Sequence, residues 1–404
     1  MVASRRKKCS VKNPDKNERI ALVHHWMEYF RGGEAVLEQF GNLFPGAPIC
    51  ILVYNEKHLP SSLLSHPLHA SLLQRWSWLR LHFRNLLPVF PEIIRSMRLP
   101  TGTRFVLSSD ASMIKGIPTR GAVHVCYCHS PPRYLWGHEE SYIDSLGKRS
   151  RLGRFIFSAA LPRLRAFDRR MAQQVDRFVA NSRCVQERIR RCYGRESVVI
   201  NPPVDIGRFN WSRTREPFFL IVSALVPYKR VDLAVEACSR AGRRLVVIGT
   251  GPEAPDLRRS AHSCIEFLGW QPDTVVADHL ERCRAFLFPG IEDFGITPCE
   301  AQAAGAPVIA YGEGGALETV QEGVSGIFFK SQTVEGLIEA IERFEKMPPF
   351  SAQACRANVE HLSPSRFREE IRSYLIGQYP EVFEGHDWSE AIGANPVKGA
   401  SHYE

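Results

Sequence analysis

Hydrophobic and polar positions along this 404-residue chain follow a repeating order of strand and helix. Short apolar runs, which suit buried strands, are separated by stretches in which apolar residues recur every three or four positions, as on a helix. Strands that alternate with helices predict parallel, doubly wound sheets. In the first half the apolar runs lie at residues 20–24, 49–54, 105–108, 123–128, 178–180 and 198–200, with helical stretches at 34–43, 72–87 and 166–175.

A second series of the same kind begins after a break in the pattern. Pro202 and Pro203 interrupt regular structure, and a segment without clear periodicity leads to Pro217. We therefore expect two domains, at residues 18–207 and 208–365. A helix at 366–383 is expected to cross back to the N-terminal domain, residues 1–17 to be a basic disordered tail, and 384–404 to be a polar tail. The apolar runs of the second series lie at residues 218–223, 245–248, 265–268, 285–288, 307–311 and 327–329.

Composition excludes several classes of protein. With 44% hydrophobic and 24% charged residues, the chain has the composition of an ordinary soluble globular protein. No apolar run approaches the roughly 20 residues that span a bilayer, and the basic N-terminus lacks the apolar core of a secretory signal. The eleven cysteines follow no disulfide or zinc-site spacing and suit a reducing compartment. We expect a cytoplasmic protein.

The net charge of +9 is concentrated in two blocks. One lies at residues 5–8, and the other runs from Lys148 to Arg170, where Leu152 and Phe155 recur at helical spacing between arginines. Such a basic amphipathic helix predicts peripheral binding to an anionic membrane surface, on the inner face of the membrane. The alternative is a core helix with a solvated basic face. No nucleic-acid recognition module is legible, so nucleic acid is not an expected partner.

Residues 288–320 hold two glutamates in a strand, loop, helix and strand order. Glu292 lies in a glycine-bounded loop after an apolar run, and Glu300, seven intervening residues later, opens a predicted helix. Ligands of parallel sheets bind at the carboxyl ends of strands, and a helix N-terminus attracts anions. The residues from Thr297 to Glu300 also match a capping box, which would explain Glu300 without a ligand but leaves Glu292 unexplained.

This segment resembles the E-x7-E element of the retaining GT-B glycosyltransferases of family 4. The resemblance implies the GT-B fold, an α/β architecture in which two doubly wound Rossmann-like domains face a central cleft. It also implies that Glu292, with Phe294, Gly295 and Ile296, binds the donor sugar and takes part in catalysis. Glu300 would then bind the ribose of the sugar nucleotide.

Basic residues follow the first strand of the second domain. Lys229 matches the lysine with which the family grips the donor diphosphate, and we assign Arg230 to the same role. Many members of the family carry an arginine where this chain has Ala224, and Arg230 is expected to supply that charge. The alternative is a pair of solvated cations, although cations are disfavoured where a helix begins.

A glycine pair follows the next strand. Gly249 and Gly251 match the G-x-G-x-x-A dinucleotide fingerprint, which leaves an NAD-dependent dehydrogenase as an alternative. Pro252 interrupts that turn, and the glycosyltransferase family uses a similar G-x-G-P turn near its donor. Phe267 and Leu268 resemble the nucleobase pocket of the same family. The resemblance therefore assigns both glycines, the phenylalanine and the leucine to the nucleoside.

In the first domain, the segment from Val125 to Trp136 resembles the CHSP-x-RY segment of the family's O-antigen and lipopolysaccharide mannosyltransferases. His129 matches the histidine that reaches the donor sugar from the acceptor side, and we assign it to catalysis. A lone histidine at a strand end is more often structural. Gly32 and Gly33 resemble the family's glycine loop, which approaches the diphosphate closely because glycine has no Cβ.

The sequence contains no D-x-D element, so we expect neither a metal nor a cofactor beyond the sugar-nucleotide co-substrate. The resemblance implies retention of anomeric configuration, by a front-face substitution in which the leaving diphosphate helps to deprotonate the acceptor. We expect transfer of mannose from GDP-mannose to a lipid-linked saccharide or polysaccharide, in lipopolysaccharide or polysaccharide synthesis. The alternatives are a UDP-hexose donor, the dehydrogenase, and a protein that binds sugar nucleotides without turnover, which Ala224 favours.

Overall fold

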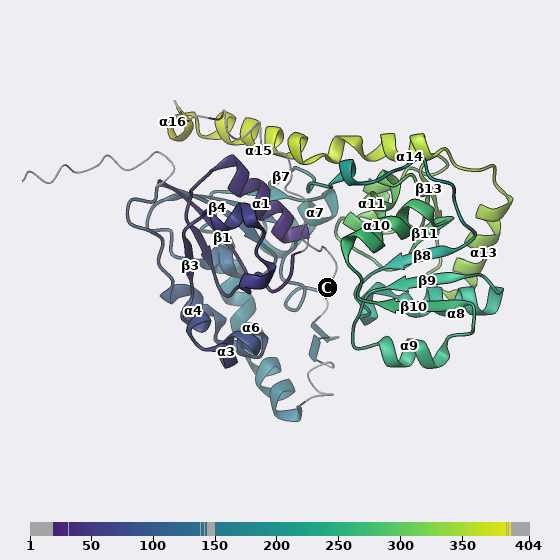
Figure 1. The fold of residues 1–404 in the computed structure, drawn as a ribbon. Helices are drawn as coiled ribbons and strands as arrows, with labels where there is room; N and C mark the ends of the chain where they lie inside the picture. The colour runs from purple at the N-terminus through teal and green to yellow at the C-terminus, as the bar shows by residue number, and fades with distance from the viewer. Residues whose placement is uncertain are drawn as a thin grey trace, which may run out of the picture.

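The computed structural model describes residues 19–30, 32–137, 139–140, 142–143, 150–384, 386 and 388. Two α/β domains lie side by side, and a long helical segment near the C-terminus runs across both (Figure 1). The tail predicted at residues 1–17, most of the tail predicted at 384–404, and the start of the basic block at 148–149 lie outside the described residues.

The N-terminal domain is built on a seven-stranded sheet in the order β3-β2-β1-β4-β5-β6-β7. All neighbouring strands pair in parallel, as the alternation of strands and helices predicts. The strands are β1 (Ile20–His24), β2 (Ile49–Ile51), β3 (Leu68–Ala70), β4 (Phe105–Asp110), β5 (Val123–Cys128), β6 (Arg177–Ala180) and β7 (Ser197–Val199). The helices are α1 (Gly32–Leu43), α2 (Ser61–Leu64), α3 (Ser77–Leu81), α4 (Phe90–Ser96), α6 (Arg151–Ala172) and α7 (Arg183–Tyr193).

The second domain repeats the plan on a six-stranded parallel sheet in the order β10-β9-β8-β11-β12-β13. Its strands are β8 (Phe219–Val222), β9 (Leu245–Ile248), β10 (Ile265–Gly269), β11 (Ala285–Phe288), β12 (Val308–Tyr311) and β13 (Gly326–Phe329). Its helices are α8 (Val231–Ala241), α9 (Ala254–Ser260), α10 (Asp273–Arg282), α11 (Ile296–Ala303), α12 (Ala316–Thr319), α13 (Val334–Lys346) and α14 (Ala352–Val359). The predicted fold class, two doubly wound α/β domains, is confirmed.

One predicted helix is broken. The stretch 72–87 forms η3 (Leu72–Arg75), α3 and η4 (Phe83–Val89) in place of one helix. Trp76 between the first two is extended, with φ −116° and ψ 116°. The side chains of Trp76, Trp78 and Leu81 keep 55, 66 and 69% of their surface exposed. The apolar spacing here therefore does not mark a buried helix face. The helical stretch predicted at 166–175 is the end of the longer α6.

The end of the chain packs against the N-terminal domain. In α15 (Pro364–Gln378) the side chains of Phe367, Ile371 and Leu375 are buried in the same core as Phe40 of α1 and Tyr127 of β5. The rings of Phe367 and Phe40 stack with centroids 6.0 Å apart. The short α16 (Pro380–Phe383) continues this packing. The long C-terminal segment in Figure 1 thus connects the two domains through apolar contacts.

Each sheet reverses its strand order at one point. In the first sheet the reversal lies between β1 and β4, and in the second it lies between β8 and β11. Ligands of open parallel sheets bind in the crevice beyond the carboxyl ends of such strands. Among the described residues, no helix is both long enough and apolar enough to cross a bilayer.

Candidate functional site

A cavity of 1480 Å³ lies between the two domains, at the carboxyl ends of strands from both sheets. The N-terminal domain contributes the loops after β1 and β5, and the second domain contributes the loops after β8, β9 and β11. Most of the predicted site residues line it: Gly32, Gly33, His129, Lys229, Gly249, Glu292, Phe294, Gly295, Ile296 and Glu300. Arg230, Gly251, Phe267 and Leu268 are not among the lining residues.

Lys229 and Glu292 meet on the wall that the second domain provides. Lys229 ends the short helix η7 (Pro227–Lys229) after β8, Glu292 lies in the loop after β11, and their side chains form an ion pair. Gly290 makes this approach possible, because a Cβ there would lie 2.8 Å from the carbonyl oxygen of Lys229. The side chains are 18 and 19% exposed, so both groups remain open to exchange partners with a ligand.

Helix α11 begins earlier than the predicted capping box requires. Gly295, with φ +89°, occupies the N-cap, and the helix starts at Ile296. No side chain caps this helix, so the prediction that Thr297 caps it with Glu300 in the reciprocal position is wrong. The physical reason is that glycine reaches a left-handed conformation at little cost and lets the chain turn into the helix before the threonine. Glu300 therefore lies in the second turn.

Arg208 is the partner of Glu300, and sequence reasoning missed it. The Nη2 of Arg208 donates to Oε1 of Glu300 at 2.7 Å, and Nη1 lies 3.5 Å from the carboxylate of Asp273. Arg208, Glu300 and Asp273 all line the cavity. Because the two paired residues are 92 positions apart, no local spacing pointed to the pair. On the wall of the second domain Lys229 thus pairs with Glu292, and Arg208 pairs with Glu300 and Asp273.

On the opposite wall, three histidines surround Ser109 at the end of β4. The Oγ of Ser109 lies 2.8 Å from Nε2 of His129 and 3.1 Å from Nδ1 of His24. Its carbonyl oxygen accepts a hydrogen bond from Nδ1 of His25 at 3.3 Å. The imidazoles also lie against Gly33, where an added Cβ would be 3.7 Å from an atom of each ring. The glycine loop is therefore packed directly on the histidine group.

Burial keeps two members of this histidine group, His25 and His129, uncharged. Loss of solvent lowers the pKa of His25 to about 3 and the pKa of His129 to about 4. Burial acts on the pKa of Glu34 in the raising direction, but the hydrogen bond and charge of His24 outweigh it and hold that pKa below its ordinary value. At neutral pH His25 and His129 are therefore neutral, and Glu34 is an ionised carboxylate.

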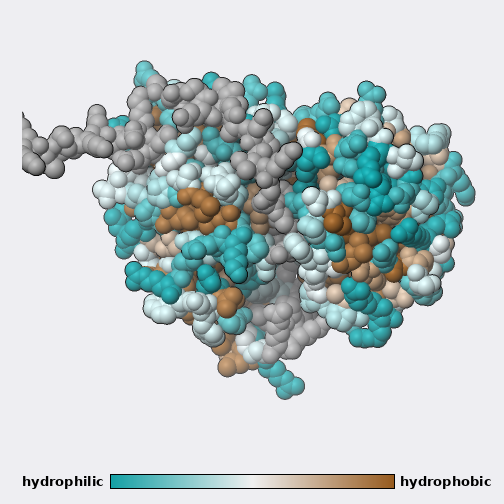
Figure 2. All heavy atoms as spheres, viewed as in Figure 1, coloured by the Kyte–Doolittle hydropathy of each residue, from teal (hydrophilic) through white to brown (hydrophobic). Residues whose placement is uncertain are grey.

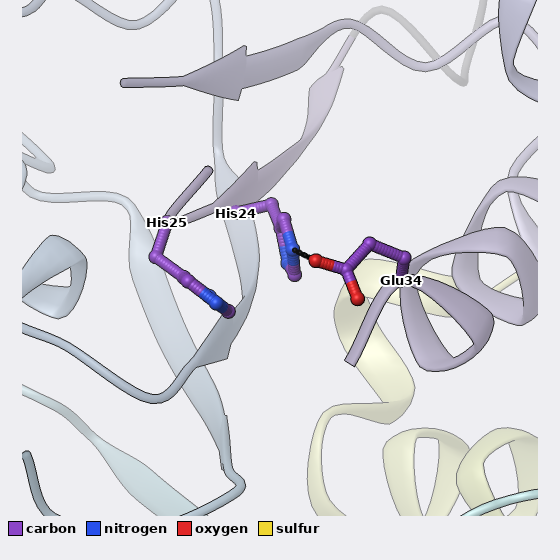
Figure 3. A group of neighbouring side chains, drawn as sticks. All are labelled: His24, His25 and Glu34. Carbon is purple, nitrogen blue, oxygen red and sulfur yellow. Dashed lines mark ion pairs between the residues drawn. The ribbon is translucent and has the colours of Figure 1, made fainter. Parts of the chain in front are cut away.

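The group of His24, His25 and Glu34 is also the one place among the described residues where ligand atoms for a metal come together. One ligand atom from each of the three side chains lies within 4.8 Å of the others. Figure 3 shows Glu34 projecting from α1 toward His24 at the end of β1, and Oε1 of Glu34 is 3.6 Å from Nε2 of His24. Imidazole and carboxylate ligands would suit a transition metal. A metal is not needed to explain why these three side chains lie together. The contacts of the two histidines with Ser109 and the pairing of His24 with Glu34 hold them in place, and the group supports the glycine loop packed on it.

Beneath Ser109, a buried charge network fixes the end of β4. Lys115 lies 3.2 Å from a carboxylate oxygen of Asp110 and 2.5 Å from one of Asp168. Asp110 also accepts from the backbone N–H groups of Ser112 and Lys115. All three charged side chains are almost completely buried, so their contacts hold the adjoining Ser109 in a fixed place.

Arg230, which is predicted to bind the diphosphate with Lys229, does not line the cavity. Its backbone is left-handed, with φ 53°, and its guanidinium turns toward Asp232 at 3.2 Å and Gln332 at 3.3 Å. The charge expected to replace an arginine at Ala224 is thus engaged outside the cavity, whereas Ala224 itself lines it.

The nucleoside assignments divide in the same way. Gly249 lines the cavity, and Gly251 instead lets the loop after β9 pack on the loop after β8, since a Cβ there would be 2.2 Å from the carbonyl oxygen of Leu225. Phe267 and Leu268 pack against the cores on the two faces of the sheet. Of the four residues only Gly249 lines the cavity. The predicted contact of the Phe267 segment with the base uses main-chain groups, so the packing of these side chains does not decide it.

Comparison with known proteins agrees with this geometry. The protein family described as "Glycosyl transferases group 1" matches residues 206–361, which hold Lys229, Glu292 and Glu300. The chain is 29% identical over 213 residues to the GDP-mannose-dependent alpha-(1-6)-phosphatidylinositol monomannoside mannosyltransferase of Mycobacterium tuberculosis, covering 45% of this chain and 55% of that protein. It is 39% identical over 116 residues to the human alpha-1,3/1,6-mannosyltransferase ALG2, covering 28% of each. The chain thus spans about half the length, or less, of these relatives.

Solved structures establish the fold over most of the chain. The sucrose-phosphate synthase of Thermosynechococcus elongatus superposes with a TM-score of 0.69, covering 90% of this chain and 100% of that one, at 16% identity. The Anabaena protein HepE in complex with UDP-glucose superposes with a TM-score of 0.63, covering 89% and 99%, at 15% identity. The two domains have the GT-B architecture, as predicted.

Proposed function

We propose that this protein is a retaining glycosyltransferase that moves mannose from GDP-mannose onto a lipid-linked saccharide or polysaccharide. The proposal rests chiefly on one observation: a paired lysine and glutamate, Lys229 and Glu292, face the neutral His129 across a cavity between two GT-B domains. The mannosyltransferases among the relatives support the choice of donor, and the match of the second domain to a glycosyltransferase family supports the class.

In this proposal Lys229 holds the donor diphosphate. Its ammonium group leaves Glu292 and binds phosphate oxygens, and the positive end of α11, with its free N–H groups, faces the same space. Gly32 and Gly33 approach from the other domain, close enough that a Cβ on Gly32 would lie 2.2 Å from Cδ1 of Ile296. Cations and N–H dipoles that are already in place stabilise the charge that develops on the leaving group. We therefore propose transfer without a metal ion.

Glu292 and His129 act on the sugar in this scheme. Glu292, once released by Lys229, accepts hydrogen bonds from the hydroxyl groups of the sugar. The bond from the anomeric carbon to the diphosphate oxygen breaks, and the bond to the acceptor oxygen forms on the same face. The proton of the acceptor hydroxyl passes to the departing diphosphate, so the products are the glycoside with retained configuration and protonated GDP. His129 remains neutral and lines the acceptor side.

Glu300 binds the ribose in this proposal, as a carboxylate that accepts from two vicinal hydroxyl groups. Arg208 holds Glu300 in place through the 2.7 Å hydrogen bond. A UDP-hexose donor is the second candidate, because among the similar structures the Anabaena protein was solved with UDP-glucose. The ribose contact is common to both donors, so the choice between them depends on the base.

We also propose that an anionic membrane presents the acceptor. Figure 2 shows apolar side chains at the surface near the tip of the N-terminal domain, where α3 and α6 lie in Figure 1. Within α6 the exposed apolar residues Leu152, Phe155 and Ile156 alternate along the chain with the exposed Arg151 and Arg154, which suits the interface of an anionic bilayer. In and just before α3, Trp76, Trp78 and Leu81 are also exposed.

Vesicle sedimentation tests the membrane contact. The wild-type protein is expected to sediment with phosphatidylglycerol vesicles and to remain in solution with phosphatidylcholine vesicles. Replacement of Leu152 and Phe155 by serine should abolish sedimentation, and Val198→Ser, at an exposed apolar position of β7, should not change it. If the wild-type protein did not sediment with phosphatidylglycerol vesicles, the proposed membrane contact would be wrong.

A product assay tests the function itself. The protein is incubated with GDP-mannose or UDP-glucose and a synthetic polyprenyl-diphosphate-linked sugar, and the products are analysed by mass spectrometry and NMR spectroscopy. We expect release of GDP and one added mannose in the α-configuration of the donor. If only UDP-glucose gave a product, the proposed donor GDP-mannose would be wrong and UDP-glucose would take its place. A product with inverted anomeric configuration would exclude the front-face reaction. If neither donor gave a product, a protein that binds sugar nucleotides without turnover would be favoured.

A further inference from the structure

Two carboxylates of the second domain reach across to the N-terminal domain beside the cavity. Asp293 directly follows Glu292, and its Oδ2 accepts hydrogen bonds from Nε and Nη2 of Arg133 at 3.0 and 2.8 Å. Its other oxygen lies 3.6 Å from Nε of Arg188 in α7. Each oxygen of one carboxylate therefore faces an arginine of the opposite domain.

These contacts are shielded from solvent. The side chain of Asp293 is 10% exposed, and the side chains of Arg133 and Arg188 are 23 and 21% exposed. The guanidinium of Arg133 also lies 5.2 Å from the ring centre of Tyr228, the residue before Lys229. One arginine of the N-terminal domain thus contacts both segments that carry the ion pair of Lys229 and Glu292. Ion pairs with this little solvent are stronger than exposed ones.

A second contact lies at the N-terminus of α7. The two carboxylate oxygens of Glu318, in α12 of the second domain, accept from the backbone N–H groups of Arg183 and Cys184 at 2.8 and 2.9 Å. The N–H groups in the first turn of a helix have no partner within the helix and attract negative charge. α7 therefore meets the second domain twice, through its first turn and through Arg188.

The two carboxylates belong to one packed unit. The N–H of Gly315, which precedes α12, donates to the carbonyl oxygen of Glu292 at 2.8 Å. A Cβ on Gly315 would lie 2.4 Å from Cα of Phe294, so the two loops are in direct backbone contact. Any movement of Asp293 or Glu318 relative to the N-terminal domain consequently moves the loop that holds Glu292.

We propose that Arg133, Arg188, Asp293 and Glu318 form an interdomain latch that positions Glu292 when the two domains close. Arg133 is a positioning residue: it binds Asp293 and so fixes the loop one residue away from the sugar-binding glutamate. This inference rests on the proposed transfer reaction for its effect on turnover. Binding of the nucleotide needs the wall of the second domain, whereas transfer also needs the latch.

The test uses the full chain with Asp293→Asn and Arg133→Gln, singly and together. Each single change is expected to lower kcat at least about 30-fold, the effect of removing one partner of a buried charge pair. Calorimetry should give a Kd for GDP within about 3-fold of the wild-type value, since the nucleotide wall is intact. The double variant should be no worse than either single one, because both changes break the same contact.

Two further variants separate positioning from a general structural role. Asp293→Glu keeps the negative charge and should recover at least about 5-fold in kcat over Asp293→Asn, as expected where the charge pair matters. Arg190→Gln is the matched control, because Arg190 is exposed on α7 and pairs with Glu187 of its own helix at 2.8 Å. It should leave kcat unchanged.

Small-angle X-ray scattering without any substrate reports the latch independently of the reaction. Asp293→Asn should enlarge the radius of gyration relative to the wild type, and Arg190→Gln should not. If the wild type transfers no sugar but Asp293→Asn increases the radius of gyration, the latch is supported and the proposed function is wrong. Unchanged scattering together with unchanged kcat in Asp293→Asn would overturn the latch.

Discussion

The two walls of the cleft hold their functional groups in opposite electrostatic states. The wall of the second domain carries charges that pair with each other, Lys229 with Glu292 and Arg208 with Glu300. The wall of the N-terminal domain carries imidazoles that are held around Ser109, and burial keeps His25 and His129 neutral by lowering their pKa values to about 3 and about 4. Both walls lie at the carboxyl ends of parallel strands, yet the groups held there are paired charges in the second domain and buried imidazoles in the first.

We use this difference to divide the proposed reaction between the two walls. Partly exposed ion pairs can exchange a protein partner for a ligand partner at modest cost, because neither ion has to be stripped of a full water shell. A diphosphate is therefore expected to bind the charged wall. The buried imidazoles of His25 and His129 carry no charge that could neutralise phosphates, but they can help to hold a sugar and an incoming hydroxyl group in a fixed place. Substitutions on the two walls should accordingly change different measured quantities.

The largest effect is expected on the charged wall at Glu292. Glu292→Gln should lower kcat about 100- to 1,000-fold, because the sugar loses a carboxylate that is fixed in place during bond exchange. The Kd for GDP, measured by calorimetry, should stay near the wild-type value. Glu266→Gln is the control, since Glu266 is exposed on the second domain and pairs with Arg244. Normal turnover in Glu292→Gln would remove this residue from the reaction.

Next in size is the loss of the lysine from the same wall. Lys229→Ala should weaken binding of GDP and of GDP-mannose about 10- to 100-fold, the range for charge-assisted hydrogen bonds to a phosphate. Titration calorimetry gives this number directly, and Lys330→Ala serves as a control at an exposed lysine of the same domain. Equal affinities for wild type and Lys229→Ala would place the diphosphate elsewhere.

The buried histidines of the N-terminal domain should make the stability of the protein sensitive to acid. Burial lowers the pKa of His25 to about 3 and those of His124 and His129 to about 4, and all three belong to the N-terminal domain. Below the ordinary histidine pKa of about 6.5, the unfolded chain binds more protons than the folded one, so the free energy of unfolding falls as the pH drops from 6.5 toward 4.

Urea titrations at several pH values measure this slope. His25→Gln should flatten it, since each such histidine contributes roughly 2 kcal/mol over that interval. The same difference between the walls predicts where the protein first loses stability in acid. At pH 5, amide hydrogen exchange should increase more in the N-terminal domain than in the second domain. An acid response that begins in the second domain would contradict the assignment of the neutral wall.

The smallest predicted effect concerns Arg208. Arg208→Gln should weaken GDP binding only about 3- to 10-fold, because Arg208 orients Glu300 without itself holding the ribose. The effect should be smaller for 2′-deoxy-GDP, which lacks one of the hydroxyl groups that Glu300 is proposed to bind. If Arg208→Gln weakened both nucleotides equally, the contact of Glu300 with the ribose would have to be abandoned.

The order of apolar and polar residues along the chain was enough to predict features that depend on neighbouring residues, such as strands and the loops that follow them. Buried parallel strands read as continuous apolar runs, so the fold class and every strand of both sheets except β3 could be predicted. The edge strand β3 is only partly buried and has no such run. Glu292 and Glu300 could be expected at one edge because a strand, a loop and a helix carry them to the carboxyl end of the sheet. The glycines at 32 and 33 lie beside them for the same topological reason.

Contacts between distant segments could not be predicted in this way. Arg208 meets Glu300 across 92 positions, and Arg133 meets Asp293 across 160. The direction of Arg230 follows from a single left-handed backbone conformation, and the start of α11 follows from another at Gly295. Neither leaves a mark on apolar spacing. The prediction of one helix from Leu72 to Leu87 failed for a different reason: several of its apolar side chains lie on the surface, so their spacing does not mark a buried helix face.

The central claim is that the charged wall of the second domain binds a sugar nucleotide. Titration calorimetry of the wild-type chain with GDP, GDP-mannose, UDP, UDP-glucose and NAD tests it most directly, because only ligands of the native state bind with a defined stoichiometry. The account predicts one site per chain for GDP and GDP-mannose, weakened in Lys229→Ala. Binding of NAD alone, or of no nucleotide at all, would contradict it.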